Sequence, residues 1–285
     1  MKICPSCVAR HERAEWLCPV CARSPDSQGG IVRFAPALAE ENDGFSAESF
    51  ACLALLESGS FWFRARNRLI VWSLQRHFGQ VGSFLEIGCG TGFVLAGVHR
   101  AFPQAILAGS EIYDQGLSFA RDRVPAAQLY QMDARKLPFE EEYDVVGAFD
   151  VLEHIDEDDA VLREMFRTVR KGGGIVVTVP QHPFLWAEVD DYSFHKRRYT
   201  RPELLRKVRA AGFQVERVTS FVSLLLPLMM LSRLSRRKFN PGAELRLPGA
   251  LDRMLEAIMA MEGALIRCGL SLPAGGSLLL VARKT

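Results

Sequence analysis

The glycine-rich stretch at residues 84–93 (FLEIGCGTGF) is the part of the chain whose residue types point most directly to chemistry. Glycine accepts positive φ angles and has no Cβ, so Gly88, Gly90 and Gly92 permit a tight turn that a ligand can approach closely. Such a turn between a strand and a helix presents backbone N–H groups and the positive end of the helix dipole. The stretch therefore indicates a site for a nucleotide-like cofactor.

The spacing G-x-G-x-G differs from the G-x-G-x-x-G of dinucleotide-binding proteins. An acid, Glu111, follows about 20 residues later, after the apolar run 105–110, where its carboxylate can accept hydrogen bonds from ribose hydroxyls. Together these features resemble motif I and its acidic partner in the class I S-adenosylmethionine (SAM) methyltransferases. The alternative is that the glycines only punctuate a loop and that Glu111 is an ordinary carboxylate at a strand end.

The resemblance continues through three further segments in the family's order. Residues 131–134 (QMDA) are similar to the turn after the third strand, which implies that Asp133 contacts the adenine amino group. Residues 143–154 look like the fourth motif, where the strand end lines the cofactor, and residues 171–180 look like the following turn and fifth strand. Motifs in register along this length favour a cofactor site over a loop.

SAM carries no phosphate, so its amino-acid end needs backbone N–H groups for the carboxylate and an acid such as Glu86 for the ammonium. The resemblance implies a set of cofactor-contacting residues in these motifs. They are Glu86, Gly88, Cys89, Gly90, Gly92, Glu111, Ile112, Asp133, Ala134, Asp150 and Val151.

A sulfonium is already a good methyl donor, so the protein must align an acceptor and, for a hydroxyl acceptor, remove its proton. The candidate catalytic residues are His154, after the fourth strand, and His195 and Tyr199, after the fifth. Acceptor contacts in this fold come from the carboxyl ends of the strands. Packing beside the cofactor is an equal alternative for His154. Asp150, Glu153 and His154 could also bind Mg²⁺, as in some quinone O-methyltransferases of this superfamily.

The segment 182–199 combines basic and aromatic residues. Arg197 and Arg198 could bind a phosphate or carboxylate of the acceptor bidentately, and Trp186 and Tyr192 favour a lid or an acceptor pocket. The alternative is a solvated charged run before a helix. This part of the chain resembles a bacterial methyltransferase subgroup of uncertain substrate, which names no reaction.

Four cysteines form two Cys-Pro-x-Cys pairs near the N-terminus: Cys4, Cys7, Cys18 and Cys21. Four thiolates are the ligand set of a closed structural Zn²⁺ site, which can fold a segment too small to bury a core. A redox dithiol is the alternative. The other three cysteines are scattered, unlike a secreted disulfide framework, and the segment MKICPSC lacks the apolar region of a signal peptide. We therefore expect reduced thiols and a cytoplasmic protein.

An α/β fold must position these groups. Strands are predicted at 83–88, 105–110, 127–131, 143–149, 174–180, 213–219 and 277–283, with helices between most of them. This pattern predicts a Rossmann-like, seven-stranded methyltransferase sheet with an N-terminal zinc ribbon-like unit and a helical insertion before the last strand. The predicted units are a zinc-binding unit at 1–30, a helical lead-in at 31–80 and a methyltransferase domain at 81–285, with the insertion at 221–274.

The insertion begins with the apolar run 221–231 and continues with Arg233, Arg236, Arg237 and Lys238. The run is shorter than the roughly 20 residues that span a bilayer, but it suits an interfacial helix or the wall of an apolar pocket. A second segment, 251–266, is apolar on one face. We therefore expect a small or lipid-like acceptor, with either peripheral contact at the inner membrane surface or a homodimer contact through 221–274.

The leading hypothesis is a SAM-dependent methyltransferase that acts on a small or lipid-like acceptor, at oxygen. An rRNA or tRNA base methyltransferase is the first alternative, because a four-cysteine unit ahead of a class I domain also resembles certain rRNA guanine methyltransferases. A formal net charge of only +2 weighs against nucleic acid as a partner. The second alternative is a non-catalytic SAM-binding module whose zinc unit recruits a protein.

Overall fold

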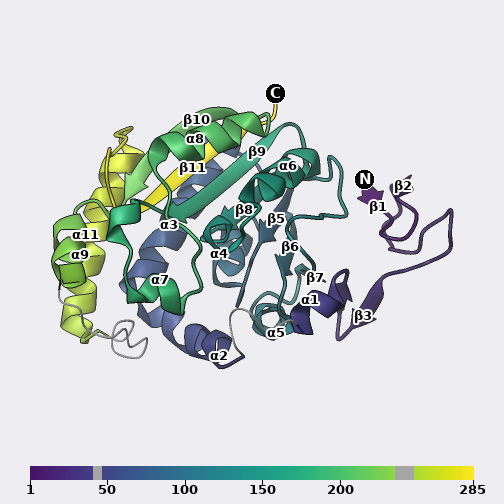
Figure 1. Ribbon diagram of the computed structural model, residues 1–285, viewed down its shortest axis with the longest axis horizontal. Helices are drawn as coiled ribbons and strands as arrows, with labels where there is room; N and C mark the ends of the chain where they lie inside the picture. The colour runs from purple at the N-terminus through teal and green to yellow at the C-terminus, as the bar shows by residue number, and fades with distance from the viewer. Residues whose placement is uncertain (41–46, 235–246) are drawn as a thin grey trace.

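A nine-stranded sheet forms the centre of the protein, and helices cover both of its faces (Figure 1). The computed structural model describes residues 1–40, 47–234 and 247–285. The strands of the sheet are β3 (Asp26–Gln28), β4 (Ile31–Arg33), β5 (Ser83–Ile87), β6 (Ile106–Glu111), β7 (Gln128–Gln131), β8 (Tyr143–Phe149), β9 (Val169–Pro180), β10 (Gln214–Phe221) and β11 (Ser277–Arg283). Their spatial order is β10-β11-β9-β8-β5-β6-β7-β4-β3.

The six strands from β4 through β7, β6, β5 and β8 to β9 pair in parallel. The strand β11 runs antiparallel to its neighbours β9 and β10, and β3 runs antiparallel to β4. Because parallel strands end at the same edge of a sheet, the residues that follow β5, β6, β7, β8 and β9 meet there. This edge is where the sequence places its candidate site.

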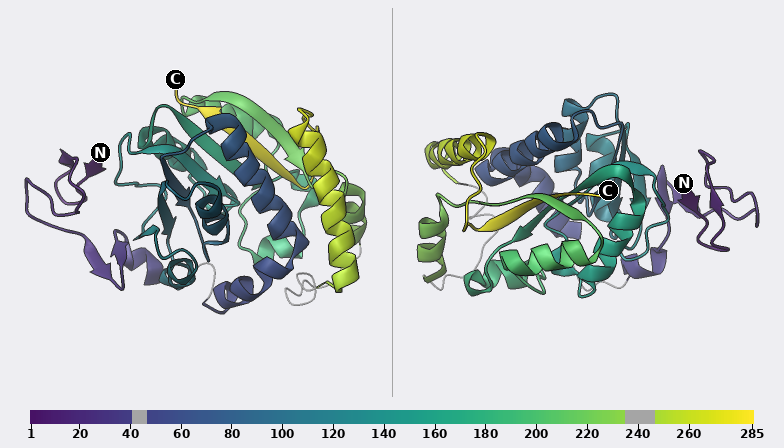
Figure 2. Two further views of the ribbon diagram at one scale, coloured as in Figure 1. Left: turned by 180° about the vertical axis from the view of Figure 1, so that it is seen from behind. Right: turned by 90° about the horizontal axis from the view of Figure 1, so that it is seen from above.

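The described helices are α1 (Pro36–Glu40), α2 (Ala47–Leu56), α3 (Phe61–Phe78), α4 (Phe93–Ala101), α5 (Asp114–Arg123), α6 (Asp158–Thr168), α7 (Glu188–Tyr192), α8 (Arg201–Ala210), α9 (Leu226–Leu234) and α11 (Gly249–Arg267), with short 3₁₀ turns at Glu57–Gly59, Leu152–His154 and Pro183–Leu185. One apolar core joins the sheet to α3, α4, α5 and α11. A second core on the opposite face joins it to α6 and α8 (Figure 2).

The central strand β5 shows why the sheet forms here. All five of its residues are buried, and alternate side chains enter opposite cores: Phe84 packs on the α3 side and Leu85 on the α6 side. A strand covered on both faces carries a continuous apolar run, which is what the sequence shows before Gly88. The strand therefore delivers the glycine-rich turn at a fixed point of the sheet edge.

All seven predicted strands are present, and β8 and β11 have the predicted bounds. The strand β9 begins earlier than predicted, at Val169. The sheet is also wider, because β4 pairs with β7 and carries the hairpin partner β3 with it. The prediction of a helical lead-in over 31–80 is therefore wrong at its start: Ile31–Arg33 is a strand, and its three residues are too few to show a periodicity.

The cysteine-containing segment lies at the far edge of the sheet, next to β7 and the loop that follows it. Its own strands, β1 (Lys2–Ile3) and β2 (Arg10–His11), form a small antiparallel pair. Trp16 attaches it to the domain: the Trp16 ring centroid lies 4.7 Å from that of Phe34 and 5.6 Å from that of Phe139. The segment and the main sheet therefore share an aromatic contact.

The insertion supplies α9 and α11, which lie at the opposite end of the protein from the cysteines (Figure 2). Phe221, the first residue of the predicted insertion, still belongs to β10. The side chains of the predicted basic run at Arg233, Arg236, Arg237 and Lys238 lie outside the described part. Across the described ranges, none of the helices has the length and apolar character needed to cross a membrane.

Candidate active site

A cavity of about 1480 Å³ opens at the carboxyl edge of the sheet. A second cavity of about 290 Å³ adjoins it and shares Gly88, Glu111, Val151 and His154 as lining residues. Eight of the predicted cofactor residues line the larger cavity: Glu86, Gly88, Cys89, Gly90, Glu111, Ile112, Asp150 and Val151. Asp133 and Ala134 line the smaller one. The two cavities thus form one elongated site along the ends of β5, β6, β7 and β8.

The glycine-rich turn has the backbone that its sequence predicts. Gly88 and Gly92 have φ angles of 64° and 75°, and Gly92 precedes the first residue of α4. A Cβ on Gly92 would lie 2.9 Å from Cα of Ala120, so α4 approaches α5 too closely for any side chain there. Gly92 does not line either cavity, so its role is to position the turn.

Gly92→Ala is therefore expected to destabilise the protein more than an alanine at a glycine with a similar φ and free space. Gly172 is the matched control, with a φ of 78° and no atom within 4 Å of the point that a Cβ would occupy. The left-handed conformation costs about 1–2 kcal/mol in both variants. The contact with Ala120 adds about 1–3 kcal/mol of overpacking in Gly92→Ala alone. Urea denaturation checks the difference, and equal losses would contradict it.

Two acids at the turn suit different parts of the cofactor. Glu86 is buried, and its Oε2 has no hydrogen-bond partner among the described residues. Burial raises the pKa of Glu86 well above its usual range. A cation placed against this carboxylate would offset that cost, as the ammonium of SAM would. Glu111 accepts hydrogen bonds from the N–H groups of Ile112 at 2.8 Å and Gly90 at 3.2 Å, which fixes its carboxylate at the cavity wall.

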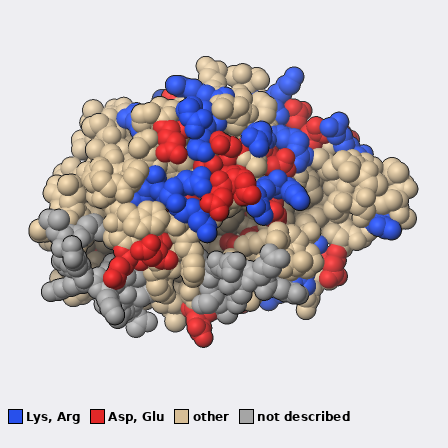
Figure 3. Space-filling model, viewed as in Figure 1, with Lys and Arg blue, Asp and Glu red and all other residues tan. Residues whose placement is uncertain are grey.

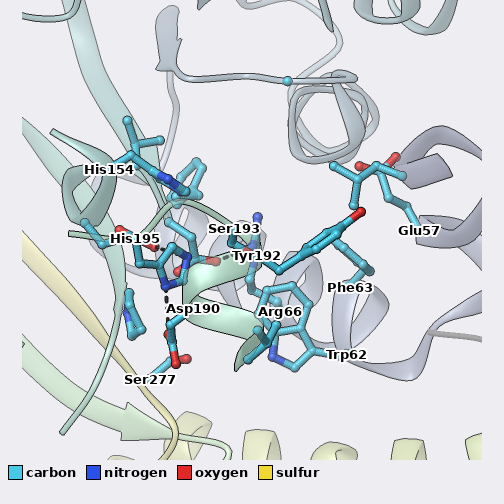
Figure 4. A pocket seen from close by; sticks show the side chains of 18 of the residues that line it. Glu57, Trp62, Phe63, Arg66, His154, Asp190, Tyr192, Ser193, His195 and Ser277 are labelled. Atoms are coloured by element: carbon cyan, nitrogen blue, oxygen red, sulfur yellow. Dashed lines mark hydrogen bonds and ion pairs between the residues drawn. The ribbon is translucent and has the colours of Figure 1, made fainter. Parts of the chain in front are cut away.

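The lead-in helix α3 contributes a cation that the sequence analysis missed. Arg66 forms an ion pair with Asp150, and its guanidinium lies 4.7 Å from the ring centroid of Trp62. In Figure 4, Trp62, Phe63 and Arg66 lie together on one side of the cavity. A signal was present, since three aromatic residues at 61–63 shortly precede Arg66, but three arginines in five positions look like a solvated face.

His154, His195 and the buried Asp190 lie together on the other side of the cavity (Figure 4), and the buried carboxylate of Glu153 adjoins His195. Nδ1 of His195 lies 2.8 Å from Oδ1 of Asp190, and Nε2 lies 4.0 Å from Oε1 of Glu153. The rings of His154 and His195 meet edge to face at 4.8 Å. Burial lowers the pKa of His154 to about 4 and raises that of Glu153 well above its usual range.

Asp190 is the other residue of this site that sequence reasoning missed. Its carboxylate is fully buried and also accepts hydrogen bonds from Nε of Arg198 at 2.8 Å and from the Ala187 N–H at 2.9 Å. These contacts fix the position at which Asp190 holds His195. In the sequence Asp190 stands in an acidic run, VDDY, that gives no sign of burial.

The predicted acceptor and catalytic residues divide into two groups. Trp186, Tyr192, His154, His195 and Arg198 line the larger cavity, with Trp186 and Tyr192 exposed at its rim. Tyr199 and Arg197 line neither cavity. The Tyr199 hydroxyl is buried and donates to Oδ2 of Asp158 at 2.6 Å, and Arg197 pairs with Asp156 and Asp158. These two residues connect the segment after β9 to α6.

The trio predicted for Mg²⁺ does not come together as predicted. Asp150 is held by Arg66 and by the Thr178 hydroxyl, which donates at 3.1 Å. Among the described residues, the group with metal-ligand proximity on this side of the cavity is Glu153, His154 and His195. A metal site at this position would therefore use His195 in place of the predicted Asp150.

One end of the larger cavity is apolar. Val222 and Leu225, just after β10, line it together with Leu228 and Met229 of α9 and Leu255 of α11. The cavity therefore extends from the cofactor turn to the two helices of the insertion.

The four N-terminal cysteines converge, with Sγ of Cys4 3.6 Å from Sγ of Cys21 and Sγ of Cys7 3.6 Å from that of Cys18. A tetrahedral Zn²⁺ with Zn–S bonds of about 2.3 Å requires sulfur separations of about 3.8 Å. The donor set and its spacing therefore fit zinc. None of the four lines either cavity of the site.

Comparisons with known proteins agree with this geometry. Residues 85–177 match the family model of the methyltransferase domain. A probable S-adenosylmethionine-dependent methyltransferase of Mycolicibacterium smegmatis is 28% identical over 190 residues, which cover 65% of this chain and 64% of the relative. A phosphatidylethanolamine N-methyltransferase of Cereibacter sphaeroides is 36% identical over 104 residues, or 34% of this chain and 49% of that protein.

Among solved structures, the SAM complex of Haemonchus contortus phosphoethanolamine N-methyltransferase 2 has a TM-score of 0.58 at 17% identity, over 87% of this chain and 60% of that chain. At this identity the likeness concerns the fold. The chain spans between 49% and 64% of the length of the two curated relatives. These matches mark residues 85–177 as a methyltransferase domain, and its relatives include a probable SAM-dependent methyltransferase.

Proposed function

We propose that this protein transfers the methyl group of SAM to a hydroxyl oxygen of a small, apolar or lipid-like acceptor. The observation that carries the proposal is that His195, an imidazole held by a buried carboxylate, lines the same cavity as the cofactor turn and the apolar residues of the insertion. A hydroxyl acceptor needs such a base to remove its proton during the transfer.

The cofactor residues divide the binding of SAM among them. The turn at Gly88–Gly90 lines the cavity and would receive the amino-acid end of SAM, whose ammonium Glu86 holds, and Glu111 accepts from the ribose hydroxyls. Asp133 and Ala134, in the smaller cavity, contact the adenine. Bound SAM supplies an electrophilic methyl group that needs no further activation.

His195 suits the role of general base better than His154. Because its Nδ1 donates to Asp190, its Nε2 keeps the lone pair that accepts a proton from the acceptor. Burial lowers the pKa of His154 to about 4, so this ring holds a proton poorly. Burial of Glu153 favours its neutral carboxyl form, which cannot accept a proton. We assign His195 as the base and Asp190 as its positioning residue.

His195→Gln is expected to slow methyl transfer about 10²–10⁴-fold, the usual contribution of a general base. Tritiated methyl transfer from SAM to a bacterial lipid extract measures the rate, and mass spectrometry of the product identifies the methylated atom. The SAM dissociation constant should change little, because the cofactor contacts remain. His99→Gln, on α4 and outside both cavities, is the matched control.

Two results would overturn the proposal. Methyl transfer at the wild-type rate in His195→Gln would rule out His195 as the general base. A methyl group found on carbon or nitrogen of the product would rule out oxygen as the acceptor atom. Binding of SAM without transfer to any extract would favour the non-catalytic module instead.

The cysteine cluster would hold a structural Zn²⁺, as its four converging sulfur atoms support. Zinc-binding cysteines must stay reduced, and a reducing compartment keeps them so. We therefore propose a cytoplasmic location. No separate observation favours RNA as the substrate. On the face in Figure 3, Lys and Arg are interspersed with Asp and Glu.

A further inference from the structure

We propose that the solvent-facing sides of α9 and α11 rest on an anionic lipid surface, from which the apolar acceptor passes into the cavity. The inference deepens the proposed function, on which the passage of the acceptor depends. The contact with lipid is a separate property that can be measured without methyl transfer.

The helix α9 and the turn before it have two apolar sides. Leu225 and Met229 face the cavity, whereas Leu224, Leu228 and Leu231 are exposed. The exposed positions recur at i, i+4 and i+7, so they form one stripe. No charged residue occurs in 221–232. Three exposed leucines on a single short segment form an apolar patch. Such patches commonly mark a site of contact with a membrane or a partner.

The helix α11 lies at the same end of the protein as α9 (Figure 2) and carries a second apolar stripe. Leu251, Met254 and Met261 are exposed, while Leu255 and Met259 on the other side are buried against the domain. A helix of this length with an uncovered apolar stripe lies in an interface when one is available.

The acids of α11 are turned away from its exposed stripe. Asp252 and Glu256 both pair with Arg64 of α3, at 2.5 Å. Glu262 is buried and accepts from the N–H groups of Val222 and Ser223 at 2.6 Å each. All three acids of α11 therefore bind groups of the protein itself.

The charged side chains left on the exposed side of α11 are basic. They are Arg253 and Arg267, and both are exposed. Exposed apolar stripes with basic residues beside them are complementary to anionic lipid headgroups and the acyl region beneath them.

Continuity with the cavity argues for lipid over protein as the occupant. Leu228 lines the apolar end of the cavity and is also 53% exposed, so the stripe and the cavity share a border. A lipid surface that covers the stripe would bring apolar acceptors to this border without passage through water. A second copy of the chain would cover the same border with protein and supply no acceptor.

Vesicle sedimentation tests the proposal with two types of vesicle: phosphatidylcholine mixed with phosphatidylglycerol, and phosphatidylcholine alone. Wild-type protein is expected to bind the anionic vesicles, and Leu231→Glu to lower the partition coefficient about tenfold or more, since the change removes an inserted leucine and adds a repelled charge. Ile106→Glu is the matched control: Ile106 is 58% exposed, against 64% for Leu231, and lies at the amino end of β6. It should bind as wild type does.

Arg253→Glu extends the test to charge. It is expected to weaken binding to the anionic vesicles severalfold and to leave binding to phosphatidylcholine little changed, because only the electrostatic part is lost. Wild-type protein that binds neither vesicle, or equal binding by Leu231→Glu and Ile106→Glu, would overturn the proposal. So would light scattering that shows a dimer in wild type and a monomer in Leu231→Glu. SAM affinity by calorimetry, measured on the same variants, separates any of these results from a failure of the proposed methyltransferase.

Discussion

Glu111→Ala is expected to weaken SAM binding about 100-fold or more. The carboxylate lies at the cavity wall, fixed by the N–H groups of Gly90 and Ile112. Without it, two ribose hydroxyls lose hydrogen bonds to a charged group, each worth about 1.5–3 kcal/mol. Isothermal titration calorimetry with SAM measures the change in dissociation constant.

Glu216→Ala is a suitable control for this change. Glu216 also pairs with neighbouring side chains, His77 and Arg283, but it lies on β10 outside both cavities. It should keep the wild-type affinity. Wild-type affinity in Glu111→Ala itself would contradict our assignment of the ribose site, and with it the orientation of the cofactor.

The second large effect is expected from the cysteine cluster. Wild-type protein should contain about one zinc per chain, and Cys4→Ser/Cys18→Ser should contain almost none, because each Cys-Pro-x-Cys pair loses one of its two thiolates. Binding of a structural zinc contributes on the order of 10 kcal/mol to the folding of the unit that holds it. Elemental analysis measures the metal, and limited proteolysis should show cleavage of the N-terminal segment in the variant.

The chain offers its own control for the loss of two thiols. Cys52→Ser/Cys268→Ser removes two cysteines that belong to neither pair and should retain the zinc and the resistance to proteolysis. Purified wild-type protein that is free of metal and nevertheless fully folded would disprove the zinc site.

The central sheet could be predicted because each strand carries a signal of its own. The strands β5, β8 and β11 are largely apolar runs, as expected of strands that are buried on both faces. The short strands β3 and β4 could not be predicted this way. Each has only three residues; β4 is held by pairing with β7, a contact distant in the sequence, and β3 is held by pairing with β4. Local patterns contain no information about such pairing.

The same distinction applies to the site. Gly88, Gly90 and Glu111 could be selected from the sequence by their type and spacing, and all three line the cavity. Arg66 and Asp190 were missed, because their roles depend on burial and on ion pairs with Asp150 and His195 that the local residue pattern does not indicate. Tyr199 was selected by its residue type, but its buried hydroxyl donates a hydrogen bond to Asp158 and does not line the cavity.

The helices before β5 have a consequence for how the protein is divided. The buried carboxylate of Glu57 accepts from the Thr91 hydroxyl of the glycine-rich turn and pairs with Arg123 at 2.7 Å, and Arg66 lines the cavity. The stretch that aligns with the family, residues 85–177, contains neither Glu57 nor Arg66. A fragment cut at those alignment limits would lack one wall of its own binding site, so the smallest unit worth expressing begins upstream of α2.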